Sequence, residues 1–150
     1  MQCACIQEPC WIPMATIRTY SELRRFSSFE ERFEYLKLEG GVGLVTFGFD
    51  RWINQRFYRS REWRTTRDFV IVRDGSCDLG IPGYELRWGL MVHHMNPMTL
   101  NDIQHEGESI LDPEFLITTS MQTHNALHYG TADCLPRGPV ERKAGDTRLW

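Results

Sequence analysis

Apolar residues at helical spacing predict a helix that begins near residue 28. Ser28 can accept a hydrogen bond from the first turn of this helix, and Glu31 completes the reciprocal pair known as a capping box. Gly40-Gly41 is expected to end the helix. One face carries aromatic and aliphatic side chains, which we expect to be buried in the core rather than to bind a cofactor: Phe29, Phe33 and Leu36.

Two arginine-rich helices are predicted next. Asp50 can cap a helix over residues 51–58, and Ser60 can cap another that runs from Arg61 to about Arg73. Asp74-Gly75 is expected to stop the second of these helices. Its inward side chains are predicted to be Trp63, the stem of Arg67, Val70 and Ile71.

The second half of the chain has the pattern of strands followed by a helix. The segments 84–88 and 90–94 are strand-like, and Asn96-Pro97 ends the second of them. A loop over residues 98–111 separates them from a β-branched return strand at 115–119. Ser120 and Gly130 then frame a helix, so the order is strand, loop, strand, helix.

This order of elements predicts an α+β fold with one main domain. The expected parts are an irregular N-terminal extension (1–19), a helical part (20–60), a core (61–130) and an irregular tail (131–150). A chain of 150 residues with 41% hydrophobic residues is long enough to bury a core of its own. Met1 and Met14 are both candidate starts of translation.

The composition favours a cytoplasmic protein without a membrane partner. No apolar run approaches the roughly 18–20 residues of a membrane span, and the N-terminus does not resemble a signal peptide. The five cysteines are an odd number and form no Cys-x-x-Cys pair, so we expect free thiols. A cysteine-based zinc site is the less favoured alternative, because no second close pair completes it.

Arginines are concentrated in one stretch although the net charge of the chain is −3. Between residues 51 and 73 there are seven arginines but only two acidic residues, Glu62 and Asp68. This local excess of positive charge suits contact with phosphate groups. A solvated helix face is the plainer interpretation. If the stretch binds DNA, the candidate contacts are Arg61, Arg64, Arg67 and Arg73.

Four of the five histidines lie in two close pairs. His124 and His128 are one helical turn apart, so both rings project from one face and can chelate a single metal ion. His93 can supply a third nitrogen, which leaves His94 as a general base. Adjacent strand residues face opposite sides, so we expect the strand to end or bend near Asn96-Pro97 and bring all four imidazoles into one pocket. Three ligands beside a base are typical of a hydrolytic metal site rather than a closed structural one.

The stretch from Arg61 to Gly130 resembles the HNH endonucleases, which have a ββα-metal fold. The resemblance lies in a small set of residues: Trp63, Arg73-Asp74-Gly75, Cys77, Val92-His93-His94-Met95-Asn96-Pro97, Leu116-Ile117, His124-Asn125 and His128. The flanking segments Tyr20-Ser21-Glu22-Leu23 and Phe29-Glu30-Glu31-Arg32-Phe33 are similar to small phage-encoded HNH proteins.

The resemblance implies a metal-dependent DNA endonuclease or nickase. His93, His124 and His128 would bind one divalent ion (Mg²⁺, Mn²⁺, Ni²⁺ or Zn²⁺), and His94 would act as the general base. DNA would be the partner, with a phage packaging machine as a further candidate, and the host cytoplasm would be the location. In the family an asparagine that braces the loop of the base precedes the apolar pair; this chain has Phe115 at that position.

Two other functions fit the same residues. Because Phe115 occupies the position of the bracing asparagine, the chain could be a DNA-binding or packaging accessory protein that keeps the HNH fold with weakened catalysis. A zinc-stabilised interaction module is the third possibility, and it predicts that a chelator unfolds the protein. Many relatives also carry a Cys-x-x-Cys knuckle where this chain has Cys77-Asp78-Leu79-Gly80, so no structural zinc is expected there.

Overall fold

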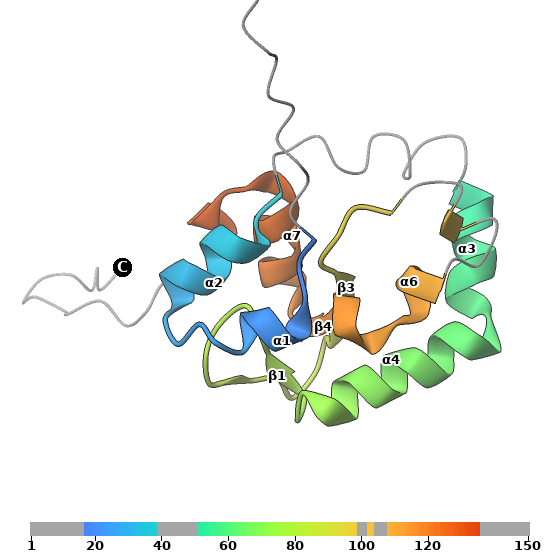
Figure 1. The fold of residues 1–150 in the computed structure, drawn as a ribbon, viewed down its shortest axis with the longest axis horizontal. Helices are drawn as coiled ribbons and strands as arrows, with labels where there is room; N and C mark the ends of the chain where they lie inside the picture. The colour runs from blue at the N-terminus through green and yellow to red at the C-terminus, as the bar shows by residue number, and fades with distance from the viewer. Residues whose placement is uncertain (1–16, 39–50, 99–101, 104–107, 136–150) are drawn as a thin grey trace, which may run out of the picture.

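The computed structural model describes residues 17–38, 51–98, 102–103 and 108–135, and mixes helices with two small antiparallel sheets (Figure 1). This arrangement confirms the predicted α+β class. No helix among these residues is long and apolar enough to cross a membrane. In chain order the elements are α1 (Tyr20–Leu23), α2 (Phe29–Leu36), α3 (Arg51–Arg59), α4 (Arg61–Arg73), β1 (Cys77–Asp78), β2 (Tyr84–Glu85), β3 (Met91–His94), α6 (Glu108–Leu111), the 3₁₀ turn η1 (Pro113–Phe115), β4 (Leu116–Thr119), α7 (Met121–Tyr129) and the 3₁₀ turn η2 (Ala132–Cys134).

The β3–β4 pair separates two apolar clusters. The strands are antiparallel, with His93 opposite Ile117 and His94 opposite Leu116. Because side chains alternate along a strand, neighbouring residues belong to different clusters. Leu116 packs on the α4 side with Phe57, Trp63, Val70, Ile103 and Ile110. Ile117 packs on the other side with Leu23, Leu36, Met95 and Leu127.

The predicted helices begin where their caps indicate. Ser28 and Glu31 form both hydrogen bonds of the capping box, and the side chain of Ser60 accepts a hydrogen bond from the backbone of Trp63. Ser120 caps α7 in the same way, and Gly130 ends it in the left-handed conformation at φ 65°. In α2 the last helical residue is Leu36, earlier than expected, because Lys37 leaves the helix at ψ 141°. Asp50 and Gly40-Gly41 lie outside the described residues.

The structure corrects several short elements. Strand β1 at Cys77–Asp78 was not predicted, the segment 84–88 is a strand only at Tyr84–Glu85, and the loop expected at 98–111 contains α6. The tail expected to be irregular from residue 131 begins with η2. These elements have two to four residues, so they depend on contacts with the rest of the fold rather than on local pattern. The outer parts, 1–16 and 136–150, lie outside the described residues.

Candidate metal centre

Three histidines from β3 and α7 converge on one point. The ring centroid of His93 lies 5.1 Å from that of His124 and 5.0 Å from that of His128, and the latter two rings are 4.3 Å apart. One potential ligand atom from each residue lies within 4.8 Å of the other two. The three histidines are therefore close enough to hold one metal ion, as the sequence predicted.

The nitrogens of these rings lack the partners that buried polar atoms normally have. His93 Nε2, His124 Nδ1 and His128 Nδ1 are buried without a hydrogen bond. The Nε2 atoms of His124 and His128 face each other at 3.1 Å. Two nitrogens bound to one tetrahedral ion at about 2.0–2.1 Å would be roughly 3.3 Å apart, so this pair already has nearly the spacing of ligands. The donor set thus fits a metal ion.

The electrostatics of the cluster keep its imidazoles neutral. Burial is the main cause that lowers the pKa of His93 well below its usual value, and His124 and His128 add to the effect. Burial also lowers the pKa of His124, and it lowers that of His128 to about 4. Neutral imidazole is the form that binds metals. At neutral pH the cluster therefore needs no deprotonation before an ion binds.

His94 lies on the opposite face of β3, against α4. Its ring stacks on Trp63, with centroids 5.1 Å apart and an interplanar angle of 15°. Its Nε2 lies 3.0 Å from the carbonyl oxygen of Ile110. Because a carbonyl only accepts, this geometry requires the hydrogen on Nε2 and leaves the basic lone pair on Nδ1. Burial lowers the pKa of His94 to about 4.

The position of His94 corrects one expectation. We expected the strand to end or bend so that four imidazoles meet in one pocket. Instead β3 keeps its regular pairing through His94, and strand alternation sends His93 towards α7 and His94 towards α4. Three histidines form the cluster and the fourth lies beside it, across the strand.

The end of β3 is fixed by a contact between residues that are 78 positions apart. Asn96 Oδ1 accepts a hydrogen bond from the backbone N–H of Arg18 at 2.8 Å, and Asn96 Nδ2 donates to the Arg18 carbonyl at 2.9 Å. The Arg18 guanidinium in turn donates to the carbonyls of Tyr35 and Lys37. Its positive charge is also one of the smaller causes that lower the pKa of His93. Sequence reasoning missed Arg18, because 78 residues separate it from Asn96.

A buried carboxylate fixes the start of α7. Asp78 Oδ2 accepts from the Ser120 N–H at 2.9 Å and from the Thr123 hydroxyl at 2.6 Å, while Oδ1 accepts from the Gly80 N–H at 3.0 Å. These bonds tie the hairpin that contains β1 to the first turn of the helix that carries His124. No sequence signal marks this role, since an aspartate two residues before a glycine is also common in plain turns.

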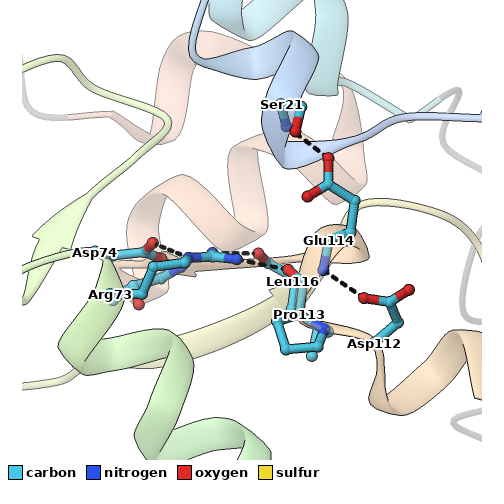
Figure 2. Close-up of polar contacts among 8 residues, drawn as sticks. Ser21, Arg73, Asp74, Asp112, Pro113, Glu114 and Leu116 are labelled. Atoms are coloured by element: carbon cyan, nitrogen blue, oxygen red, sulfur yellow. Dashed lines mark hydrogen bonds and ion pairs between the residues drawn. The ribbon is translucent and has the colours of Figure 1, made fainter.

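The arginines predicted to bind DNA divide into three environments. Arg61 and Arg64 are exposed on α4. Arg67 is half-buried, with nitrogens 3.3 Å from an Asp68 carboxylate oxygen and 3.5 Å from the Leu90 carbonyl. Arg73 is different, because its guanidinium is bound within the protein (Figure 2). It donates to Asp74 and to the carbonyls of Pro113 and Leu116 at 2.6–2.8 Å, so it is not part of the exposed arginine surface.

Comparison with known proteins returned no relative. No family model matches the chain, and neither does any curated protein or any solved structure. The function therefore has to be argued from the arrangement of its own residues.

Proposed function

We propose that the chain is a metal-dependent DNA endonuclease or nickase of the HNH type, with β3, β4 and α7 as its ββα-metal core. One observation carries the proposal. His93, His124 and His128 each place one potential ligand atom within 4.8 Å of the others and carry buried nitrogens without a hydrogen bond, and the residue next to His93 is a histidine whose tautomer is set by a backbone carbonyl. The cluster suits an open metal site, with a histidine on the neighbouring face of the same strand as the candidate base.

In this proposal the three clustered histidines hold a divalent ion. When bound, such an ion would stabilise negative charge on the phosphate and on the leaving oxygen during phosphodiester hydrolysis. Imidazole ligands suit Zn²⁺ and Ni²⁺ better than Mg²⁺, which prefers oxygen. We therefore expect the tightest binding with Zn²⁺ or Ni²⁺, while Mn²⁺ and Mg²⁺ remain candidates for supporting turnover.

His94 is the proposed general base, acting through Nδ1. The Ile110 carbonyl holds the proton on Nε2 and Trp63 holds the plane of the ring. Nδ1, which makes no hydrogen bond to a described residue, is then the nitrogen that would accept a proton from water. A pKa of about 4 keeps the ring neutral at pH 7, although it makes a weak base. The negative charge of a bound phosphate would raise that pKa towards the working range.

Exposed arginines on α4 are the proposed DNA contacts. Arg61 and Arg64 are exposed, and Trp63, on the same helix, packs against His94. Helix α4 therefore links the proposed base to a positively charged surface. Binding through such a surface should weaken steeply as salt is added. Arg67 can bind DNA once its ion pair with Asp68 breaks. Arg73 is not a proposed DNA contact, because its guanidinium is bound within the protein.

A plasmid-nicking assay tests this function. Supercoiled DNA is incubated with the protein in Mg²⁺, Mn²⁺, Ni²⁺ or Zn²⁺, and nicked and linear products are quantified. The His94→Ala variant should lose at least about 10²-fold in rate while it still binds the metal, as expected for loss of a general base. His105 belongs to neither histidine pair, so His105→Ala is the matched control. Absence of cleavage with every metal would overturn the proposal.

The second candidate is an accessory protein that binds DNA without cutting it. Phe115 favours it, because the family to which the chain is similar has a bracing asparagine there. Here the Phe115 carbonyl accepts a hydrogen bond from Met95 at 3.0 Å, and Asn96 braces the strand end through Arg18 instead. The Phe115→Asn variant separates the two candidates. If the wild-type protein is inactive and the variant nicks DNA, the site has decayed; if the wild-type protein nicks DNA, the accessory function is ruled out.

A further inference from the structure

A cavity lined by arginines lies away from the histidine cluster and from the exposed arginines Arg61 and Arg64. This cavity of about 190 Å³ opens between α1, α2 and the C-terminal end of α4. This volume is far above the roughly 10–15 Å³ that admits one water molecule. None of the four paired histidines lines it. The lining residues are Tyr20, Leu23, Arg24, Arg32, Arg73, Asp74 and Leu79.

The one acidic residue of this cavity is already neutralised. Asp74 Oδ1 accepts from Arg73 Nε at 2.8 Å, and Asp74 Oδ2 accepts from the Thr118 N–H at 2.7 Å. The Arg73 guanidinium also donates to two backbone carbonyls (Figure 2). Its central carbon lies over the Tyr20 ring, 3.7 Å from the ring centroid. Arg73 and Asp74 thus form a fixed wall with no net charge.

The other two guanidinium groups have no acidic partner. Arg32 donates from Nε to the Phe26 carbonyl and from Nη1 to the Leu79 carbonyl, both at 2.9 Å, and its Nη2 makes no hydrogen bond to a described residue. The Arg24 guanidinium carbon lies 5.7 Å from the Tyr20 ring centroid, and this group makes no hydrogen bond to a described residue. No carboxylate of the described residues pairs with either arginine. The cavity therefore carries two uncompensated positive charges.

We propose that this cavity binds a phosphate group through Arg24 and Arg32. Arginine presents planar N–H donors that match phosphate oxygens, often two at a time. Arg32 is held in place by its two carbonyl contacts, so little of its conformational freedom is lost when an anion binds. Burial also lowers the pKa of Arg32, and a bound anion would offset that effect. The phosphate can come from a nucleic-acid backbone or from a free phosphate compound.

The test uses the full-length chain and two probes. Inorganic phosphate is titrated while backbone amide resonances are followed by NMR, and binding of a short DNA duplex is measured over a range of salt concentrations. The variants are Arg24→Gln and Arg32→Gln, with Arg25→Gln as the control, because Arg25 is the exposed neighbour that does not line the cavity. Each substitution removes the same charge, so a general electrostatic effect would appear in all three.

The expected result is that Arg24→Gln weakens phosphate binding about tenfold while Arg25→Gln changes it little. If the phosphate belongs to DNA, Arg24→Gln also lowers the salt slope of duplex binding by about one. If the phosphate belongs to a free compound, Arg24→Gln leaves duplex binding unchanged but still weakens the binding of inorganic phosphate. Arg32→Gln also loses two structural hydrogen bonds, so its melting temperature is measured. If the Arg32→Gln variant is unfolded, the comparison of Arg24→Gln with Arg25→Gln decides the test. Equal behaviour of the Arg24 and Arg25 variants towards both probes would overturn the proposal.

Discussion

Helix α7 takes part in two polar regions that are built in opposite ways. At its first turn, Asp78 receives hydrogen bonds from Gly80, Ser120 and Thr123, so both carboxylate oxygens have partners. One turn later, the rings of His124 and His128 meet His93 and leave buried nitrogens unpartnered. Satisfied buried groups hold a fold together, whereas unsatisfied ones cost stability and call for another explanation. The first region therefore positions the helix, whereas the second is close enough to hold a metal ion.

The largest expected effect comes from breaking the satisfied region. The Asp78→Ala variant leaves three buried donors without an acceptor, so we expect it to lose about 3–5 kcal/mol of unfolding free energy. Urea unfolding measures this loss. Asp68→Ala is the control, because Asp68 is exposed and its surface ion pair is worth about 0–1 kcal/mol. A loss below about 1 kcal/mol in Asp78→Ala would mean that the carboxylate is not the brace we describe.

Acid should destabilise the fold through the buried histidines, because the unfolded chain binds protons that the folded chain does not. The folded pKa of His94 is about 4 while its unfolded value is near 6.5, so between these values the unfolded chain binds more protons. Stability then falls as the pH falls from about 6.5 to 4, by roughly 3 kcal/mol for His94 alone at about 1.4 kcal/mol per pKa unit. The other three histidines of the two pairs act in the same direction.

Urea unfolding at several pH values, with a chelator present, measures this dependence. The His94→Phe variant keeps an aromatic ring against Trp63 but cannot be protonated. This variant should take up about one proton fewer on unfolding in that pH interval, so its stability should depend less steeply on pH. An unchanged slope would show that His94 is not buried as a neutral ring.

Metal binding should stabilise the fold by a smaller amount. At a free ion concentration of one hundred times Kd, we expect about 2.7 kcal/mol of added stability. Thermal unfolding with and without Zn²⁺ or Ni²⁺ measures it. The His128→Ala variant should lose most of this gain and His105→Ala should retain it. If the ions stabilise both variants equally, the cluster is not where they bind.

The smallest effect concerns the end of α7. Gly130 has φ 65°, and a Cβ atom there would lie 3.0 Å from the Leu38 carbonyl oxygen, so Gly130→Ala should cost about 1 kcal/mol. Gly75→Ala is the control: φ there is also positive, at 61°, but a Cβ would meet nothing within 4 Å. Its loss, measured by the same urea unfolding, should be smaller. An equal loss would show that the contact with Leu38 adds nothing.

Local chemistry made part of the fold predictable. The caps Ser28, Ser60 and Ser120 act within three residues, so the helix starts follow from the sequence. The two-residue strand β1 could not be predicted in this way, because its partner β2 and the Asp78 bonds form only in the folded chain. The same reason hides the contact between Asn96 and Arg18.

The candidate site shows the same division. The spacing of His124 and His128 follows from helix geometry, and their meeting with His93 follows from the order strand, strand, helix. The direction of His94 was predicted wrongly, although strand alternation was the applicable rule, because a bend at Asn96-Pro97 was expected to override it. Arg73 looked like a member of the arginine face, but its carbonyl partners Pro113 and Leu116 are 40 and 43 residues away.

One titration tests the central claim most directly. Zn²⁺ is added to the protein in which the histidine side chains are labelled with ¹⁵N, and the imidazole nitrogens are followed by NMR. We predict that nitrogens of His93, His124 and His128 shift together and saturate at one ion per chain, while His105 does not shift. Saturation of any other histidine first, or an absence of shifts in these three rings, would contradict the account.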